Sequence, residues 1–296
     1  MAGKNAESKK ISIRIFDNTE VRAVWDDDNS KWWFSVLDIV GVLRGETNYE
    51  KNRNYWKYLK AKLRRENNQL GSVTTQFKFT APDGKERLAN VIDYDGVKEF
   101  AKKFPSKQAN RFIEWFTYSD DTIDGKSKSK AYALFDSSLL DTLEVGTVKG
   151  LQQIHAYLFG GLYDFAGQIR EVNIAKGGHC FAPVKFLENT LRLVEKMPES
   201  SFDEIAEKYV EMNVAHPFME GNGRSTRIWL DLILKKNLKL CVDWSLISKT
   251  DYLSAMQEST MDSKRIKDLL QNALTNKIRS REIFMKGVDY SYYYEE

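Results

Sequence analysis

The chain has 296 residues, of which 42% are hydrophobic and 12% aromatic, so it can form one large domain or two modest ones. Its net charge of +3 is too small to indicate nucleic-acid binding by itself. The two cysteines, Cys180 and Cys241, lie far apart and in no metal-binding spacing, which argues against a disulfide framework or a zinc site.

Residues 1–10 are polar and charged, which predicts a disordered start without the apolar segment of a signal peptide. No apolar run elsewhere approaches the about 20 residues that cross a bilayer. We therefore expect a cytoplasmic protein with no membrane contact.

Residues 11–118 carry the patterns of a mixed α+β module. Alternating apolar residues and turn signals predict five strands, at residues 11–16, 21–25, 32–34, 77–79 and 88–92. Helical spacing of apolar residues predicts four helices, at residues 36–43, 52–65, 96–104 and 109–118.

This module resembles the Bro-N module of phage antirepressors and their bacterial relatives. The resemblance is carried by Ile13-Arg-Ile-Phe16, Val21-Arg-Ala-Val-Trp25, Trp33-Phe-Ser-Val-Leu-Asp-Ile-Val40 and Asn54-Tyr-Trp-Lys57. It implies DNA binding, in which the basic helix at 52–65 would contact phosphates, with Tyr55, Trp56 and Tyr58 between its cations. The alternative is a solvated basic face on a module that recognises protein.

Residues 119–130 are polar, charged and poor in bulky apolar side chains, which predicts a linker. A mostly α-helical domain is expected at residues 131–285, because apolar residues recur there at helical spacing. His155 in this domain is expected to be a core or capping histidine.

The stretch from His216 to Arg227 places a base, a carboxylate, two glycines, an amide and two arginines within twelve residues. A capping box at Ser201-Phe-Asp-Glu204 starts a helix before it, and Pro217 should end that helix at about His216. A second helix is expected to begin near Arg224. The loop amides and the N-terminus of this second helix predict an anion site.

The side chains of the stretch suit a nucleotide phosphate. Arg224 and Arg227 lie on one side of the second helix and can fork onto phosphate oxygens. Glu220 is a hard oxygen ligand suited to a magnesium ion that bridges phosphates. His216 can take a proton from an attacking hydroxyl, because histidine titrates near neutral pH.

The letters HPFMEGNGRSTR match the Fic family motif, H-[PX]-F-x-[DE]-G-N-G-R-x-x-R, at every defined position. The resemblance implies a mostly helical Fic domain with a β-hairpin flap, which transfers AMP from ATP to a protein hydroxyl with Mg²⁺. Such an enzyme is a nucleotidyltransferase, a protein adenylyltransferase. Both loop glycines are present, which favours nucleotidyl over phosphoryl transfer.

The same resemblance implies a role for each motif residue. His216 would deprotonate a Tyr, Ser or Thr hydroxyl of the target, Glu220 would hold magnesium, and Asn222 would hold the α-phosphate. The nucleotide-binding residues would be Gly221, Asn222, Gly223, Arg224 and Arg227.

A flap over the active site is implied upstream of the motif. Its residues would be Asn173, Ile174, Ala175, Lys176, Gly177 and Gly178. A target segment pairs with such a strand edge through main-chain hydrogen bonds. Gly177-Gly178 suits the hairpin turn.

Residues 286–296 end in Ser291-Tyr-Tyr-Tyr-Glu295-Glu296. A subset of Fic proteins carries an inhibitory helix of pattern [ST]-x-x-x-E-[GN] at this end, and Ser291 and Glu295 fit it, whereas Glu296 departs from it. The resemblance implies that Glu295 pairs with Arg227 in the place of the γ-phosphate and that Ser291 anchors the helix. Self-modification at Tyr292 would displace it. The alternative is a tail that only packs its tyrosines.

Two other functions fit the same residues. One is a DNA-binding regulator with a silent Fic domain, and the other is a Fic transferase that uses another donor, such as UTP or a phosphocholine carrier. The expected partner is a target protein whose identity the sequence does not give. Relatives with a C-terminal inhibitory helix often self-associate, so a homo-oligomer is also expected.

Overall fold

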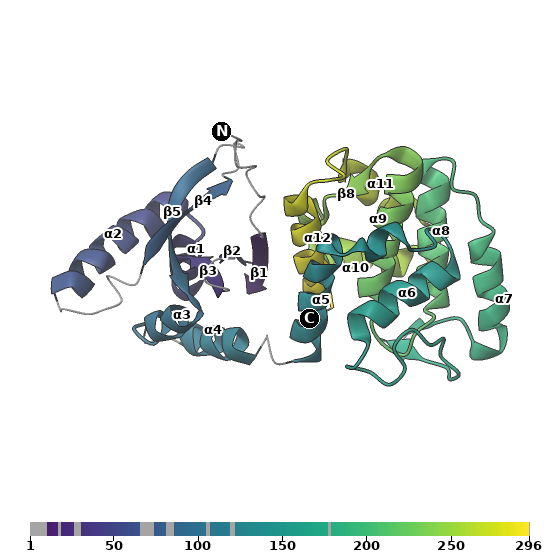
Figure 1. Ribbon diagram of the computed structural model, residues 1–296, viewed down its shortest axis with the longest axis horizontal. Coiled ribbons are helices and arrows are strands. Elements are labelled where there is room, and N and C mark those ends of the chain that lie inside the picture. The colour runs from purple at the N-terminus through teal and green to yellow at the C-terminus, as the bar shows by residue number, and fades with distance from the viewer. Residues whose placement is uncertain are drawn as a thin grey trace. The chain divides into compact units, whose positions relative to one another are not determined.

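The computed structural model describes residues 11–16, 19–26, 31–65, 74–80, 86–104, 107–118, 122–176 and 179–295. The chain divides into two compact units, Met1–Thr122 and Ile123–Glu296 (Figure 1). Residues 1–10, where a disordered start was expected, lie outside the described residues. None of the helices described is long and apolar enough to span a bilayer.

The N-terminal unit is built on an antiparallel sheet of order β1-β2-β3-β5-β4. Its strands are β1 (Ile11–Phe16), β2 (Thr19–Asp26), β3 (Lys31–Ser35), β4 (Thr75–Thr80) and β5 (Glu86–Asp93). All five predicted strands are present. The expected hairpin is also present, since Thr75 of β4 pairs with Val91 of β5 and Thr80 with Glu86.

Four helices complete this unit: α1 (Val36–Arg44), α2 (Tyr49–Arg65), α3 (Tyr94–Ala101) and α4 (Lys107–Tyr118). Helices α1 and α3 start directly at strand ends, where Ser35 and Asp93 cap them with their side chains. The expectation for Trp56 was wrong. Its ring is buried against Phe100 instead of lying on the basic surface, because position 56 falls on the inward side of α2 with Leu59.

The C-terminal unit is mostly helical. Its helices are α5 (Ile123–Asp136), the 3₁₀ turn η2 (Ser138–Asp141), α6 (Val148–Phe159), α7 (Val184–Glu195), α8 (Phe202–Ala215), α9 (Asn222–Leu238), the 3₁₀ turn η3 (Trp244–Leu246), α10 (Lys249–Glu258), α11 (Lys264–Asn272) and α12 (Arg281–Tyr293). Two short hairpins pair β6 (Ala175–Lys176) with β7 (His179–Cys180) and β8 (Cys241–Val242) with β9 (Leu274–Thr275).

Helix α9 lies at the centre of this unit. It packs against α6, α8 and α12 (Figure 1). Trp229, Leu230, Ile233 and Leu234 are at most 1% exposed, so the apolar run after the motif is buried as expected. The polar motif residues at 222–227 lie on the N-terminal turns of α9, before this buried run.

The linker expected at 119–130 is corrected in its second half. Residues from Ile123 onward form α5, which belongs to the C-terminal unit and packs against α12. The sequence of this segment is polar because some of the side chains that α5 turns toward the protein interior are polar or charged. Lys128 forms an ion pair with the fully buried carboxylate of Asp289, and Ser127 is buried as well. The end of the chain is helical, with α12 beginning at Arg281.

Candidate active site

The motif forms the turn between α8 and α9. Helix α8 starts at the predicted capping box, in which Ser201 accepts from the amide of Glu204 and the Glu204 carboxylate accepts from the amide of Ser201. The helix ends at Ala215, and His216 follows in a left-handed conformation with φ 48°. Pro217 cannot continue the helix, so the histidine faces the turn.

Helix α9 begins at Asn222 rather than near Arg224. Gly221 takes φ 80° and caps it, and a Cβ at Gly221 would lie 2.4 Å from the ring of Phe159. Only glycine fits both restraints. The Asn222 amide closes the turn by accepting from the Phe218 N–H (2.8 Å) and donating to the Phe218 carbonyl (2.7 Å).

His155 supports the turn from below, as the core histidine that was expected. Its Nδ1 accepts from the Gly167 N–H (2.8 Å), so its Nε2 carries the hydrogen and donates to the Glu220 carbonyl (2.8 Å). Its ring stacks on Phe218 at 3.8 Å. Burial lowers the pKa of His155 to about 4, so the ring is neutral near pH 7.

A pocket of about 570 Å³ opens over the N-terminus of α9. The motif contributes His216, Glu220, Asn222, Gly223 and Arg227 to its wall. Backbone amides at a helix N-terminus favour an anion in such a position.

His216 is oriented by two contacts. Its Nδ1 lies 3.2 Å from the carbonyl of Asn213, and its ring stacks on Phe181 with centroids 3.6 Å apart and planes 12° apart. A carbonyl can only accept, so Nδ1 carries the hydrogen and the lone pair of the neutral ring lies on Nε2. Such a nitrogen can accept a proton.

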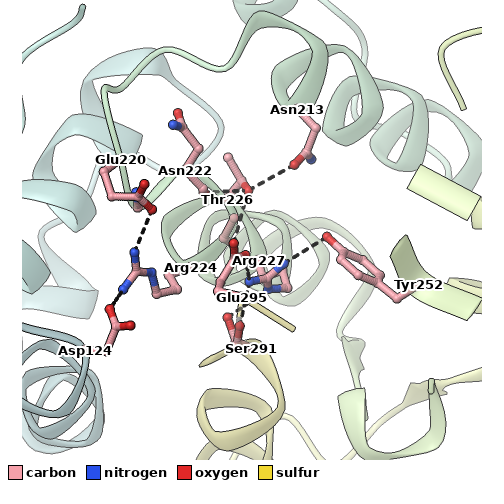
Figure 2. Close-up of polar contacts among 12 residues, drawn as sticks. Asp124, Asn213, Glu220, Asn222, Arg224, Thr226, Arg227, Tyr252, Ser291 and Glu295 are labelled. Atoms are coloured by element: carbon pink, nitrogen blue, oxygen red, sulfur yellow. Dashed lines mark hydrogen bonds and ion pairs between the residues drawn. The ribbon is translucent and has the colours of Figure 1, made fainter. Parts of the chain in front are cut away.

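Arg227 is 2% exposed and is held by three residues, shown in Figure 2. Its Nε donates to Ser291 Oγ (2.8 Å) and its Nη2 to the Ser291 carbonyl (2.7 Å). Its Nη1 donates to the hydroxyl of Tyr252 (3.1 Å), which in turn lies 2.6 Å from the hydroxyl of Tyr209. Its Nη2 also donates to Glu295 Oε1 at 2.6 Å, so the expected ion pair is present.

The Glu295 carboxylate lies directly over the first turn of α9. A Cβ built on Gly223 would come within 2.1 Å of Glu295 Oε1. The carboxylate therefore occupies the position at the helix N-terminus where an anion is favoured. Residue 296, the point where the tail departs from the family pattern, lies outside the described residues.

Arg224, which is expected to bind the outer phosphates, does not line this pocket. Its guanidinium is 3% exposed and pairs with Asp124 of α5 and with Glu220 (2.9 Å) (Figure 2). The rings of Phe159 and Tyr292 lie 4.9 and 5.4 Å from it. A buried cation needs paired anions, and these two carboxylates hold Arg224 beneath the turn.

Two family models match the chain. Residues 146–234 match the Fic/DOC family, and residues 20–122 match the BRO family, N-terminal domain. The Salmonella typhimurium protein named "Probable protein adenylyltransferase Fic" is 31% identical over an alignment of 150 residues that covers 45% of this chain and 74% of that protein. The chain belongs to the Fic/DOC family.

Other relatives match over similar stretches. The protein of the same name from Escherichia coli K12 is 31% identical over 136 residues, 40% of this chain and 67% of that protein. "Protein adenylyltransferase VbhT" of Bartonella schoenbuchensis is 28% identical over 55% of this chain but only 32% of its own length. Among solved structures, the N-terminal FIC domain of Bep8 from Bartonella sp. 1-1C aligns with a TM-score of 0.47 and 15% identity, over 55% of this chain and 88% of that chain.

The hairpin expected as the flap is present as β6–β7, in which Ala175 pairs with Cys180. Ile174 and Ala175 line the pocket, while Asn173 accepts from the N–H of Val184 (2.8 Å) and so fixes the hairpin to the start of α7. Lys176 belongs to β6, and the expected turn at Gly177-Gly178 lies outside the described residues.

Tyr292 does not reach the Fic pocket. Its hydroxyl donates to Ser127 Oγ (3.0 Å) on α5, and burial raises its pKa above the ordinary value. Tyr294 is buried on the other side of α12, where its hydroxyl bonds the carbonyls of Trp244 (2.9 Å) and Ile247 (2.8 Å). The tail is thus held at both of these tyrosines.

Several pocket residues carry no motif in the sequence. They come from α10 and the turn after it: Tyr252, Leu253, Met256, Gln257, Ser259 and Thr260. Their helical spacing indicates only a helix. Their place in the pocket depends on long-range contacts, such as those of the Tyr252 hydroxyl with Arg227 of α9 and Tyr209 of α8. Arg170, which bonds the His216 carbonyl, was likewise missed.

Proposed function

We propose that this Fic/DOC protein is a protein adenylyltransferase that transfers AMP from ATP to a Tyr, Ser or Thr hydroxyl of a target protein. One observation carries the proposal. His216 and the N-terminus of α9 face the same pocket, so the proposed proton acceptor would lie beside the proposed anion site. The relatives named as protein adenylyltransferases support it.

His216 is the proposed general base. Its Nε2 takes the proton of the target hydroxyl while the hydroxyl oxygen bonds to the α-phosphorus and the bond from that phosphorus to the β-phosphate bridge breaks. Pyrophosphate leaves with the electron pair. The contacts of His216 with Asn213 and Phe181 hold the ring for this transfer.

The phosphates are proposed to bind at the first turn of α9. The backbone amides at Asn222 and Gly223 and the guanidinium of Arg227 supply the positive field. The Asn222 side chain, expected on the α-phosphate, lines the pocket and also shapes this turn through its two bonds to Phe218.

Glu220 suits a magnesium ion. Its carboxylate is half exposed at the pocket, and the two hydrogen bonds it accepts, from Gly221 and Arg224, both fall on Oε1. Among the described residues there is no group of three His, Cys, Asp or Glu side chains, so the protein forms no complete cage. Mg²⁺ typically needs only one or two carboxylates besides phosphates and water, and when bound it would neutralise phosphate charge.

The C-terminal helix is proposed to be inhibitory. Glu295 uses the guanidinium of Arg227 and the space over Gly223 that the γ-phosphate would take. ATP would then bind only in a pose that His216 cannot use. Self-modification at Tyr292 is proposed as a release, because an AMP group on its hydroxyl would not fit against Ser127.

The test uses ATP labelled separately at the α and γ phosphates, with Mg²⁺. Wild type, Glu295→Gly and His216→Ala are compared, with a bacterial lysate as the source of targets. We expect α-label on protein, increased in Glu295→Gly and abolished in His216→Ala. γ-Label alone would make the protein a kinase. α-Label that resists His216→Ala would exclude this residue as the base, and competition with unlabelled UTP would reveal another donor.

We also propose that the N-terminal module binds DNA, since it matches the BRO family, N-terminal domain. The observation that favours DNA is the outward side of α2. Its exposed side chains include Arg53, Lys57, Tyr58, Lys62, Arg64 and Arg65. Such a row of cations beside an aromatic ring suits a phosphate backbone.

Fluorescence anisotropy of a labelled duplex at several salt concentrations tests this second function. Lys57→Ala and Arg64→Ala should each weaken binding and reduce the salt slope by about 1. The matched control is Lys102→Ala. Lys102 is an exposed lysine at the C-terminal end of α3 rather than on α2, and it pairs with Glu99 of α3. If all three substitutions change DNA binding equally, α2 is not the DNA-binding surface.

A further inference from the structure

Arg170 is a buried arginine whose guanidinium donates to four backbone carbonyls. Arg170 is 3% exposed. Its Nε bonds the carbonyl of His216 (2.7 Å), its Nη1 that of Val172 (2.7 Å), and its Nη2 those of Ala215 (3.1 Å) and Ala182. A buried arginine is usually paired with a carboxylate, so this set of acceptors is unusual.

The four carbonyls belong to two parts of the site. Ala215 and His216 form the C-terminal end of α8, where unpaired carbonyls and the negative end of the helix dipole favour a cation. Val172 and Ala182 lie on either side of the flap hairpin β6–β7. One guanidinium therefore joins the base of the flap to the backbone of the proposed catalytic base.

The backbone of Arg170 adds to this arrangement. Its N–H donates to the carbonyl of Pro217 (2.9 Å), the residue after His216. The left-handed conformation of His216 is uncommon for a residue with a side chain and persists only when its surroundings impose it. Hydrogen bonds from Arg170 to His216 and Pro217 supply that restraint.

The flap end carries the ring that covers the base. Phe181 precedes Ala182, and its ring stacks on His216 at 3.6 Å. We propose that Arg170 is a positioning residue, which orients the His216 imidazole by fixing both the His216 backbone and the segment that carries Phe181. This rests on the proposed function of His216 as the base.

Lysine cannot replace arginine in this role. An ammonium is a compact donor, whereas the planar guanidinium directs its N–H groups along fixed, divergent lines. Arg170→Lys keeps the positive charge and loses the geometry. A purely structural buried cation would tolerate this change at the active site, apart from a general loss of stability.

The kinetic test is made in the Glu295→Gly background, where AMP transfer is expected to be measurable. Arg170→Lys should lower kcat at least about tenfold, with a smaller change in KM for ATP, because the base is displaced while the phosphate site on α9 is kept. The matched control is Lys208→Met. Lys208 is also a buried cation that bonds a backbone carbonyl, that of Glu195 (3.0 Å), and it does not line the pocket. It should lower the melting temperature and leave kcat unchanged.

An NMR test needs no enzymatic activity. The chain has three histidines, so their ring ¹³C–¹H signals can be resolved, and His216→Ala assigns the signal of His216. The stacked Phe181 ring should shift that signal upfield. Arg170→Lys should move it toward the position of an exposed histidine, while Lys208→Met should not.

The outcomes separate the two proposals. A His216 signal unchanged by Arg170→Lys, or a loss of kcat that Lys208→Met reproduces, overturns the positioning role. If Glu295→Gly transfers no AMP, the proposed function fails while the NMR result still decides whether Arg170 orients His216. If Arg170→Lys does not fold, Arg170→Gln, which keeps a planar donor and adds no buried charge, replaces it. The inference then requires the same signal shift and a lower kcat, and an unchanged signal overturns it.

Discussion

Glu295 and Arg227, 68 positions apart in the chain, form an ion pair of 2.6 Å over the first turn of α9. Arg227 is buried, and the rings of Tyr252 and Tyr294 lie 5.3 Å from its guanidinium. Charge-assisted hydrogen bonds are stronger in such surroundings than at a surface. The pair therefore links the C-terminal segment directly to the proposed anion site.

Replacing Glu295 by glutamine should increase AMP transfer. The amide keeps the size of the side chain and loses the charge that competes with phosphate for Arg227. A hydrogen bond to a charged group contributes about 2 kcal/mol, so kcat/KM for ATP should rise about 30-fold. Glu282→Gln is the matched control, because Glu282 lies in the first turn of α12, the helix that leads to Glu295, and pairs with Lys286. Equal effects of the two substitutions would contradict a specific role for Glu295.

Gly223→Ala should release the C-terminal segment without increasing AMP transfer. The new methyl group would lie 2.1 Å from Glu295 Oε1 and 3.0 Å from the Arg227 guanidinium, so the carboxylate has to leave. The same methyl group also fills the proposed phosphate site. We expect faster proteolysis of the C-terminal segment together with AMP transfer no higher than in wild type.

The control for Gly223→Ala is Glu295→Gln, which should loosen the tail and also increase transfer. If Gly223→Ala increased AMP transfer as much as Glu295→Gln does, the phosphates would have to bind elsewhere. A tail as protease-resistant as in wild type would mean that Glu295 is not held over this turn.

The structure brings Asp124 to Arg224, 100 positions away. Arg224 has to leave Asp124 if it is to bind the outer phosphates as the Fic motif implies. In the Glu295→Gly background, Asp124→Asn should therefore lower KM for ATP about threefold to tenfold, since about 1 kcal/mol of ion pairing no longer competes. Asp141→Asn, an exposed aspartate in η2, is the control. A higher KM would instead mean that the pair supports the fold of the turn.

The local features of the site could be predicted from the sequence. Pro217 and the capping box at Ser201 predict where α8 ends and begins, because both act through neighbouring backbone groups. The pairing of Glu295 with Arg227 followed from the family resemblance. The helix start at Asn222 was missed by two residues, because the conformation of Gly221 depends on its contact with Phe159.

Contacts between distant segments could not be predicted. Asp124 was assigned to a linker because the polar residues of α5 have no apolar signature, although several of them pair with α9 or α12. Arg170 follows an ordinary turn, and its four acceptors are backbone carbonyls that no side-chain pattern reveals. The burial of Arg224 has the same origin, since the spacing of the two arginines does not say which helix packs over each.

The neutral His155 should make the protein less stable in mild acid. Its pKa falls from an ordinary 6.5 to about 4 in the folded chain, because burial disfavours the charged form of the ring. Protonation at Nδ1 would also break the hydrogen bond that this nitrogen accepts from the Gly167 N–H. Between these two values the unfolded chain binds a proton that the folded chain does not. Stability is therefore complete above pH 6.5 and decreases as the pH falls toward 4, by about 3 kcal/mol in total.

Urea unfolding of wild type and His155→Asn between pH 7 and pH 4.5 measures this difference. The variant should be less stable at pH 7 and should lose much of the decrease on acidification. Gln152→Ala is the matched control, because Gln152 donates to the Gly167 carbonyl (2.8 Å) and has no titrating group. It should lower stability at every pH and keep the wild-type slope. A wild-type slope in His155→Asn would assign the acid sensitivity to other groups and leave His155 without a titration role.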